Sequence, residues 1–375
     1  MKILLIPDKF KGSASAKEVV AALIKGIKRA VPHANIKSFL ASDGGDGFLD
    51  AVFNYIDAEE VKTKTFDPLG RPITASYLLN KENKSAYIEM AKASGMELLT
   101  ADERNPMDTT TFGTGVLIKN AVSQGANKIY VGLGGSATND GGVGMAKALG
   151  YGFKDHSGET IDPIGKNLIN IQSIESKSLE RYLGVSFYAV NDVQNPLYGK
   201  QGAAYVYAKQ KGASDADIED LDAGLVHLSK IVKEQLNKDI AHVSGAGAAG
   251  GLGYGLKTFL NAEYVVGIEF LLGLAKIPQL LKKQKIDYII TGEGKIDGQT
   301  LNGKLIKGVV DMGKQHKIPV LGVCGKLDID KKELFSLGLH DALEISEASK
   351  SLNYNMSHAP ELIENAIYMY FQDMA

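Results

Sequence analysis

The stretch Val131-Gly-Leu-Gly-Gly-Ser-Ala-Thr-Asn-Asp-Gly-Gly-Val-Gly144 decides how the chain is interpreted. An apolar run precedes it at residues 128–131, and the segment Met145-Ala-Lys-Ala-Leu149 follows it. This order predicts a strand, then a glycine-rich loop, then a helix. Because a loop of this kind presents backbone N–H groups to an anion, the sequence predicts an anion-binding site here.

Two nucleotide signatures can be compared with this loop. The Walker A pattern is absent, because no lysine follows the glycines of residues 132–142. Residues 132–137 meet the looser dinucleotide fingerprint, with Asp155 at a suitable distance, and residues 245–250 meet its strict form. Residues 136–140 are largely polar where a dinucleotide fold places small apolar side chains. The spacing therefore favours phosphate handling, with dinucleotide binding as the alternative.

Both ends of the chain show strands that lead through loops into helices. Residues 3–6 form an apolar run, and a capping-box pair at Ser15 and Glu18 then starts a helical pattern. A buried strand at 286–290 begins a second series of this kind near the other end. Such alternation is typical of a parallel sheet. We expect an α/β protein with a discontinuous domain at 1–66 plus 284–375 and an inserted mixed α/β domain at 67–283.

The middle of the chain follows a different pattern. Threonines precede a predicted helix at about 110–123, and Tyr205 and Tyr207 alternate with their neighbours as they would in a strand. Turn residues at 67–72 separate two predicted strands. The strands predicted here lie at 61–66, 73–79 and 85–90.

Composition limits the class of protein. The formal net charge is −2, so no general positive field attracts nucleic acid or an anionic membrane. The single cysteine, Cys324, excludes an internal disulfide framework, indicates a reducing compartment and lies in an apolar run typical of a buried strand. The first apolar run is too short for a signal peptide, and no segment reaches the ~20 apolar residues of a membrane span. We expect a cytoplasmic protein.

Four polar glycine loops follow predicted strands. Open α/β sheets bind ligands beyond the carboxyl ends of their strands, where such loops gather. The loops supply lysines, hydroxyls and carboxylates. Phosphoryl transfer needs this set: cations and N–H groups for phosphates, carboxylates for Mg²⁺ and one acid to accept a hydroxyl proton. The loops lie at residues 7–15, 42–47, 131–144 and 291–300.

Structural roles also fit several of these residues. Asp43 suits a helix N-cap, and Glu293 and Asp297 suit a solvated turn. Lys9 and Lys11 are equally consistent with surface charges. The seven histidines are scattered without the spacing of a zinc site.

Six segments in fixed order resemble the motifs of one family, the type I glycerate kinases. The segment from Gly134 to Gly142 matches that family's Gly-Gly-Ser-Ala-Thr-Asn-Asp-Gly-Gly in full. The resemblance runs from Met1 to at least Gly325, and long motifs in order are more specific than one glycine fingerprint. The other matching segments lie at residues 7–13, 42–47, 192–197, 245–251 and 291–297.

The resemblance implies ATP-dependent phosphorylation of D-glycerate, with 2-phosphoglycerate favoured over 3-phosphoglycerate as the product. It implies ATP and Mg²⁺ as cofactors and D-glycerate and a nucleotide as the partners, in a monomer or homodimer. It also implies a Rossmann- or flavodoxin-like domain built from both chain ends, with the active site in the cleft between that domain and the inserted domain. The alternatives are an NAD-dependent oxidoreductase of a small hydroxy acid and a non-catalytic anion sensor.

The resemblance and the loop chemistry together assign roles to individual residues. We expect Asp192, Asp43 and Lys11 to be catalytic, with Asp192 as the base that accepts the hydroxyl proton. We expect Glu293 and Asp297 to contact Mg²⁺. Substrate and phosphate binding is assigned to Lys9, Ser13, Gly44, Gly45, Gly134, Gly135, Ser136, Thr138, Asn139 and Asp140.

Three residues depart from the family pattern. Asp46 replaces a more usual glutamate and is one methylene shorter, which could change affinity if it reaches a metal or a glycerate hydroxyl. Phe48 stands where a small hydroxyl residue is usual, and Asn191 where cysteine or a small residue is. None of these changes removes a candidate catalytic group.

Overall fold

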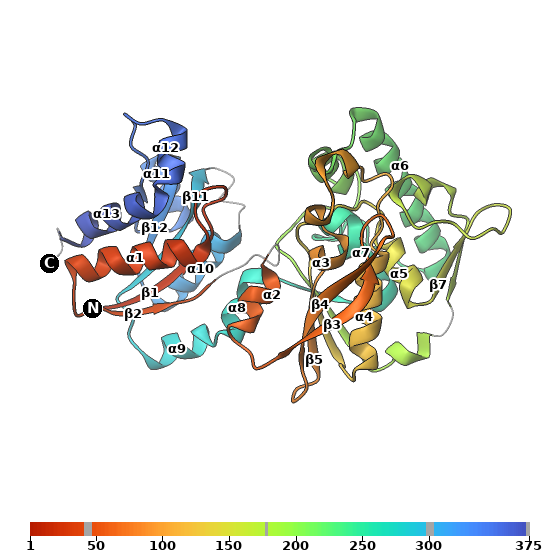
Figure 1. The fold of residues 1–375 in the computed structure, drawn as a ribbon, viewed down its shortest axis with the longest axis horizontal. Coiled ribbons are helices and arrows are strands. Elements are labelled where there is room, and N and C mark those ends of the chain that lie inside the picture. Colours follow the sequence, from red (N-terminus) through yellow and green to blue (C-terminus); the bar gives the residue numbers. More distant parts are fainter. Residues whose placement is uncertain (41–46, 177–178, 298–303, 373–375) are drawn as a thin grey trace. The chain divides into compact units, whose positions relative to one another are not determined.

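The computed structural model describes residues 1–40, 47–176, 179–297 and 304–372. The chain divides into two compact units, one that joins Met1–Ser42 to Ile268–Ala375 and one formed by Asp43–Gly267 (Figure 1). Within the described residues, no helix combines the length and apolar character that a membrane span requires.

The borders of the units differ from the limits expected at 66/67 and 283/284. Strand β3 (Glu59–Phe66) pairs antiparallel with β4 (Pro72–Asn80), so it belongs to the sheet of the second unit. Helix α8 (Gly267–Leu274) instead contributes Ile268 to the core of the first unit, and helix α9 (Ile277–Lys283) contributes Ile277. Both borders are set by long-range strand pairing and packing, which the local sequence does not indicate.

A parallel sheet forms the centre of the first unit. Its strand order is β13-β12-β11-β1-β2, and each neighbouring pair is parallel. Strands of such a sheet are joined by crossovers, as the alternation of strands and helices predicts. The strands are β1 (Lys2–Pro7), β2 (Asn35–Ser38), β11 (Tyr288–Asp297), β12 (Val320–Asp328) and β13 (Asp341–Glu344).

Helices cover both faces of this sheet. Ile3 and Leu5 pack in one core with apolar side chains of α1 and α13, while Leu4 and Ile6 pack in the other with α8 and α10. Alternate burial of this kind is expected for a strand covered on both faces. Helix α1 begins at the predicted capping box, in which Glu18 N donates to Ser15 Oγ at 3.3 Å. The other helices are α1 (Ala16–Ala30), α10 (Lys304–His316), α11 (Lys331–Leu337), α12 (Leu352–Ser357) and α13 (Ala359–Gln372).

A mixed sheet forms the centre of the second unit, in the order β10-β9-β6-β5-β4-β3. The strands β3, β4 and β5 are antiparallel neighbours, whereas β5, β6, β9 and β10 run parallel. The predicted strand pair and the predicted third strand are confirmed. The remaining strands of this unit are β5 (Ser85–Glu89), β6 (Lys128–Gly132), β7 (Tyr151–Lys154), β8 (Ser173–Ser176), β9 (Ser186–Val190) and β10 (Glu263–Val265).

Most of the buried apolar side chains of the second unit form one cluster between helices and one face of this sheet. Ile129 and Val131 of β6 are buried in one cluster with Leu117 of α4 and Met145 of α5. The helices are α2 (Phe48–Phe53), α3 (Ala91–Ser94), α4 (Phe112–Ser123), α5 (Val143–Leu149), α6 (Asp215–Leu236) and α7 (Ala248–Leu260). Shorter helical turns are η1 (Met96–Leu98), η2 (Ala101–Glu103), η3 (Gly165–Asn170), η4 (Leu179–Tyr182), η5 (Ala204–Ala208) and η6 (Lys209–Lys211).

The strand-like alternation of Tyr205 and Tyr207 is wrong as a prediction of local structure. These residues lie in the helical turn η5, not in a strand. Ala204 and Ala208, one helical turn apart, are both fully buried, so the small side chains set the period of burial.

Candidate active site

The parallel strands of the second unit end together at one edge of its sheet. Glu89 at the end of β5 is in register with Gly132 of β6, which is in register with Val190 of β9 and, through it, with Val265 of β10. The segments that follow these residues therefore emerge side by side. Carboxyl ends of parallel strands are where open α/β sheets bind their ligands.

The glycine-rich stretch occupies this edge as predicted, between β6 and α5. Asp140 is fully buried within it and accepts hydrogen bonds from Thr111 N and Thr111 Oγ1, both at 2.7 Å, and from Gly142 N and Gly144 N, both at 3.1 Å. Burial raises the pKa of the Asp140 carboxyl, and these hydrogen bonds oppose that rise. Since protein donors already occupy both oxygens, the geometry favours a role in shaping the loop over direct contact with a phosphate.

The matching segment at 245–251 packs directly against this loop. Ala249, Gly250 and Gly251 have left-handed backbone angles inside α7, and Gly141 N donates to Gly250 O at 3.1 Å. A Cβ at Gly250 would lie 1.9 Å from Thr138 O, so only glycine permits this approach. Two motifs that lie far apart in the sequence thus form one structure.

Two side chains of the loop are buried without hydrogen-bond partners in the described part of the chain. Asn139 is fully buried, and neither its Oδ1 nor its Nδ2 is paired. Thr138 is also fully buried, and its Oγ1 has no partner among the described residues. Buried polar atoms in native proteins are nearly always hydrogen-bonded, so these groups are candidates to meet a polar ligand or an ordered water.

Asp192 lies at the same edge, two residues after β9. It is 8% exposed, and its Oδ1 accepts a hydrogen bond at 3.0 Å from Gly267 N, which follows β10. Asn191 is also buried, and its Oδ1 accepts from Val193 N at 3.0 Å. The structure therefore brings Asp192 to the sheet edge from which the glycine-rich loop also emerges.

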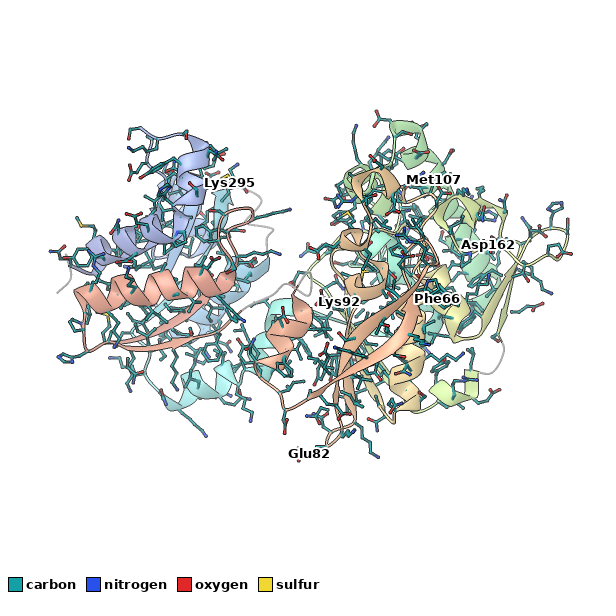
Figure 2. All side chains as sticks on the ribbon, in the orientation of Figure 1. Phe66, Glu82, Lys92, Met107, Asp162 and Lys295 are labelled. Carbon is teal, nitrogen blue, oxygen red and sulfur yellow. The ribbon has the colours of Figure 1, made fainter. Side chains whose placement is uncertain are left out.

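Glu89 was not found by sequence analysis. It is 3% exposed, and its carboxylate accepts from Gly47 N at 3.4 Å and from Leu49 N at 3.0 Å, at the start of α2. Lys92, which is labelled in Figure 2, approaches this carboxylate, and its Nζ lies 3.8 Å from Glu89 Oε1. A carboxylate at a helix N-terminus satisfies N–H groups that the helix leaves open. Glu89 thereby holds the start of α2, which residues 41–46 precede in the sequence, at the end of β5.

That preceding segment contains several predicted site residues. Asp43, Gly44, Gly45 and the variant position Asp46 all lie outside the described residues. Their roles stay predictions.

Lys211 was also missed, and it contacts the glycine-rich loop. Its Nζ donates to Ser136 Oγ at 2.7 Å and to Thr138 O at 2.6 Å, and the side chain is 3% exposed. Burial lowers its pKa to about 7, and the Asp140 carboxylate opposes that shift. No motif marks this lysine, which stands in the ordinary polar segment Gln210-Lys-Gly212.

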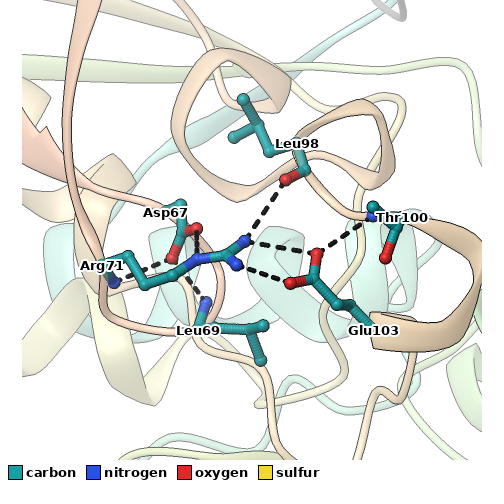
Figure 3. Close-up of polar contacts among 6 residues, drawn as sticks. All are labelled: Asp67, Leu69, Arg71, Leu98, Thr100 and Glu103. Atoms are coloured by element: carbon teal, nitrogen blue, oxygen red, sulfur yellow. Dashed lines mark hydrogen bonds and ion pairs between the residues drawn. The ribbon is translucent and has the colours of Figure 1, made fainter.

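An ion-pair network anchors the segment that supports the loop (Figure 3). Arg71 links Asp67, at 2.5 Å, to Glu103, at 2.6 Å, and these partners raise the pKa of its guanidinium. Residues 95–104 are thus tied to the β3–β4 turn. Their other end reaches the glycine-rich loop, since Met96 N donates to Gly135 O at 2.8 Å.

The remaining predicted residues lie in the first unit. Lys9 and Lys11 are exposed, and Ser13 Oγ donates to Met356 O at 2.7 Å. Glu293 is half-buried in β11, and a Cβ at the adjacent Gly294 would lie 3.5 Å from Lys11 N. The loop that carries the lysines therefore lies beside the end of β11 on which Glu293 stands.

Asp297 is half-buried and forms an ion pair at 3.0 Å with Lys295, the residue labelled in Figure 2. Lys295 also pairs with Asp328 at 3.0 Å. Among the residues whose placement is described, no group of three His, Cys, Asp or Glu side chains could hold a metal. Cys324 is buried as expected, and burial raises the pKa of its thiol to about 12, which keeps it protonated.

Comparison with known proteins agrees with the motif resemblance. The model of the glycerate kinase family matches residues 3–375. A glycerate kinase of Halalkalibacterium halodurans is 40% identical over 97% of this chain and 96% of its own length. A glycerate 2-kinase of Escherichia coli is 41% identical over 88% and 86% of the two chains. A crystal structure from Salmonella typhimurium LT2, with the proposed identity glycerate kinase 2, matches with a TM-score of 0.82 at 35% identity and covers 100% of this chain and 98% of its own. This chain belongs to the glycerate kinase family.

Proposed function

We propose that the chain transfers the γ-phosphoryl group of ATP to a hydroxyl of D-glycerate, with the 2-hydroxyl as the favoured acceptor. Family membership over nearly the whole chain supports a kinase that acts on an alcohol group, and one relative is named a glycerate 2-kinase. The relatives named above give no support to the nicotinamide-dependent alternative.

One observation in the structure carries this proposal. The loop that matches the family motif holds Thr138 and Asn139 buried, with three side-chain polar atoms that lack partners in the described part of the chain. Glycerate and ATP are rich in hydroxyl and phosphate oxygens, which can pair with such groups. We therefore assign the loop to substrate binding, with backbone N–H groups of Gly134 and Gly135 available to an anion.

The carboxylates fit a supporting role in phosphoryl transfer. Asp192 is the proposed base, because its carboxylate lies at the sheet edge from which the loop emerges and Gly267 N fixes one of its oxygens. Asp43, Glu293 and Asp297 are proposed for the remaining contacts. Mg²⁺ in kinases takes one or two carboxylates together with phosphate oxygens, so hard oxygen donors of this kind fit it without a three-residue cluster. Mg²⁺ would neutralise charge on the phosphates when bound.

Lysines of the first unit complete the proposed set. Lys9 and Lys11 are exposed, so their ammonium groups are accessible to an anionic ligand. Ser13 is proposed to act through its position in the same loop, since its hydroxyl already donates to Met356 O. We also propose that the parallel-sheet unit is of the Rossmann or flavodoxin kind. A site shared by the two units, a cytoplasmic location and a monomer or homodimer stay predictions.

The proposal is tested by ³¹P NMR of the purified protein with ATP, Mg²⁺ and D-glycerate. We expect a new phosphomonoester signal together with ADP, and the proton coupling of that signal separates the 2-phosphate from the 3-phosphate. Absence of the signal, with nicotinamide reduction in the presence of a hydroxy acid, would overturn the proposal in favour of the oxidoreductase.

A matched pair of variants tests the base. Asp192→Asn keeps an oxygen for Gly267 N but cannot accept a proton, so we expect kcat to fall by a factor of about 10²–10⁴. Asp222→Asn is the control, because Asp222 also accepts a backbone hydrogen bond, from Gly199 N at 2.7 Å, yet lies on α6. Wild-type kcat in Asp192→Asn would exclude this residue as the base.

A further inference from the structure

Lys211 places a cation inside the second unit, directly against the glycine-rich loop. Its two hydrogen-bond acceptors, Ser136 Oγ and Thr138 O, are neutral, at 2.7 and 2.6 Å. Only 3% of the side chain is exposed. A buried ammonium group is costly, and an apolar side chain of similar volume would fill the space without that cost. Packing alone therefore does not explain a lysine at this position.

In the part of the chain that the structure describes, groups on the neighbouring elements compensate the charge of Lys211 only in part. Lys209, on the same helical turn, pairs with Asp215 at 2.9 Å in solvent. Gly212 brings the main chain of Arg104 close, since a Cβ there would lie 2.0 Å from Arg104 O. Asp140 is the carboxylate that acts on the Lys211 ammonium, and its own oxygens are bound to loop N–H groups.

We propose that Lys211 is a positioning residue for phosphoryl transfer, an inference that rests on the kinase function proposed above. Its ammonium group holds the Ser136 hydroxyl and the Thr138 carbonyl. Because the peptide bond is planar, holding the carbonyl of Thr138 also fixes the N–H and the starting direction of Asn139. Lys211 thus sets the orientation of the residue whose amide is proposed to meet the substrate.

The protonation state of Lys211 supplies a signature that a purely structural residue would lack. Burial brings its pKa to about 7, so the ammonium loses its charge near neutral pH. Hydrogen bonds from a charged donor are stronger than those from a neutral amine. The hydrogen bonds from Lys211 to the loop should therefore weaken as the pH rises through this value.

The test compares Lys211→Met with Lys209→Met. Lys209 stands on the same turn but is exposed, so its variant controls for loss of a lysine in this segment. We expect Lys211→Met to lower kcat/KM for D-glycerate by up to ~100-fold, which is the scale of a 1 Å misplacement. We also expect faster hydrogen exchange in peptides that cover residues 134–142, measured by mass spectrometry without substrate, while Lys209→Met matches the wild type in both.

The pH profile completes the test. We expect wild-type kcat/KM to fall as the pH rises through about 7, which gives the pH profile a descending limb. This limb should be missing from the profile of Lys211→Met. If Lys211→Met does not fold, Lys211→Gln, which keeps an N–H donor without the charge, is measured in the same way. Wild-type exchange at 134–142, or an unchanged pH limb, overturns the proposal. A wild-type protein without kinase activity overturns the proposed function instead, and the exchange data still decide whether Lys211 holds the loop.

Discussion

Replacing Lys211 by methionine should change how the stability of the protein depends on pH. In the folded state its pKa is about 7, whereas an exposed lysine of the unfolded chain titrates near 10.5. Between these values the unfolded chain carries one proton more than the folded chain at this position. Stability of the wild type therefore rises with pH in this window, because stability rises wherever the unfolded state binds more protons.

The size of the effect follows from this difference of one proton. The free energy of unfolding of the wild type should rise by about 1.4 kcal/mol per pH unit. Over the whole interval between the two pKa values the rise amounts to about 5 kcal/mol. The methionine variant has no such proton to release. The free energy of unfolding of the wild type, minus that of Lys211→Met, should thus increase steadily from about pH 7.5 to about pH 9.5, a window that lies between the two pKa values.

The assay is urea denaturation followed by far-UV circular dichroism at several pH values in that window. The first unit is the same in both proteins, so its unfolding cancels from the difference. The pKa of Cys324 is raised to about 12, and a group that titrates in the same way in both proteins cancels as well. Two parallel stability curves across the window would refute the conclusion that burial shifts the Lys211 ammonium.

Three further experiments, each on a substitution or a matched pair of substitutions, test the loop and its supports. Asn139→Leu removes a buried amide that has no partners in the described part of the chain, so urea denaturation should show a stability that is unchanged or up to ~3 kcal/mol greater. Kinase assays should show a loss of kcat/KM, and a less stable variant would contradict this reasoning. In thermal unfolding, Gly250→Ala should lower the stability by more than ~3 kcal/mol, because its Cβ would lie 1.9 Å from a loop carbonyl oxygen. Ala249→Gly should raise the stability by up to ~1 kcal/mol, because Ala249 has a φ of +53°, and the reverse order of the two variants would refute the packing argument. Glu89→Gln should raise KM for D-glycerate and speed exchange at the start of α2, and the exposed Glu82→Gln should do neither (Figure 2); equal behaviour of the two variants would exclude the anchoring role.

Local signals explain which parts of the fold the sequence could predict. The strand, loop and helix around residues 128–149 are β6, the glycine-rich stretch and α5, as expected. The capping box at Ser15 and Glu18 also forms as predicted. In both cases the residues that decide the structure lie within one or two turns of each other. Their hydrogen bonds and periodicity can therefore be inferred without knowledge of the rest of the chain.

Long-range contacts explain where the prediction stopped. Residues 59–66 have the composition of a strand, but only pairing with β4 shows to which sheet they belong. The resemblance of residues 134–142 and 245–251 to family motifs identified both segments. Their mutual packing depends on the left-handed angles at 249–251, which a sequence of small residues does not specify.

Burial, rather than residue type, separates the charged groups that shape the loop from those on the surface. Lysine and glutamate are seldom buried, so a sequence without further marks predicts exposure for all of them. That prediction suits Lys9 and Lys11, which are exposed and were nominated from their motif, and fails for Lys211 and Glu89, which are 3% exposed. Each of the two buried charges contacts main-chain atoms at or beside a predicted binding loop. Because burying a charge is costly, a buried lysine or glutamate beside such a loop is a stronger sign of a functional role than an exposed one within the motif.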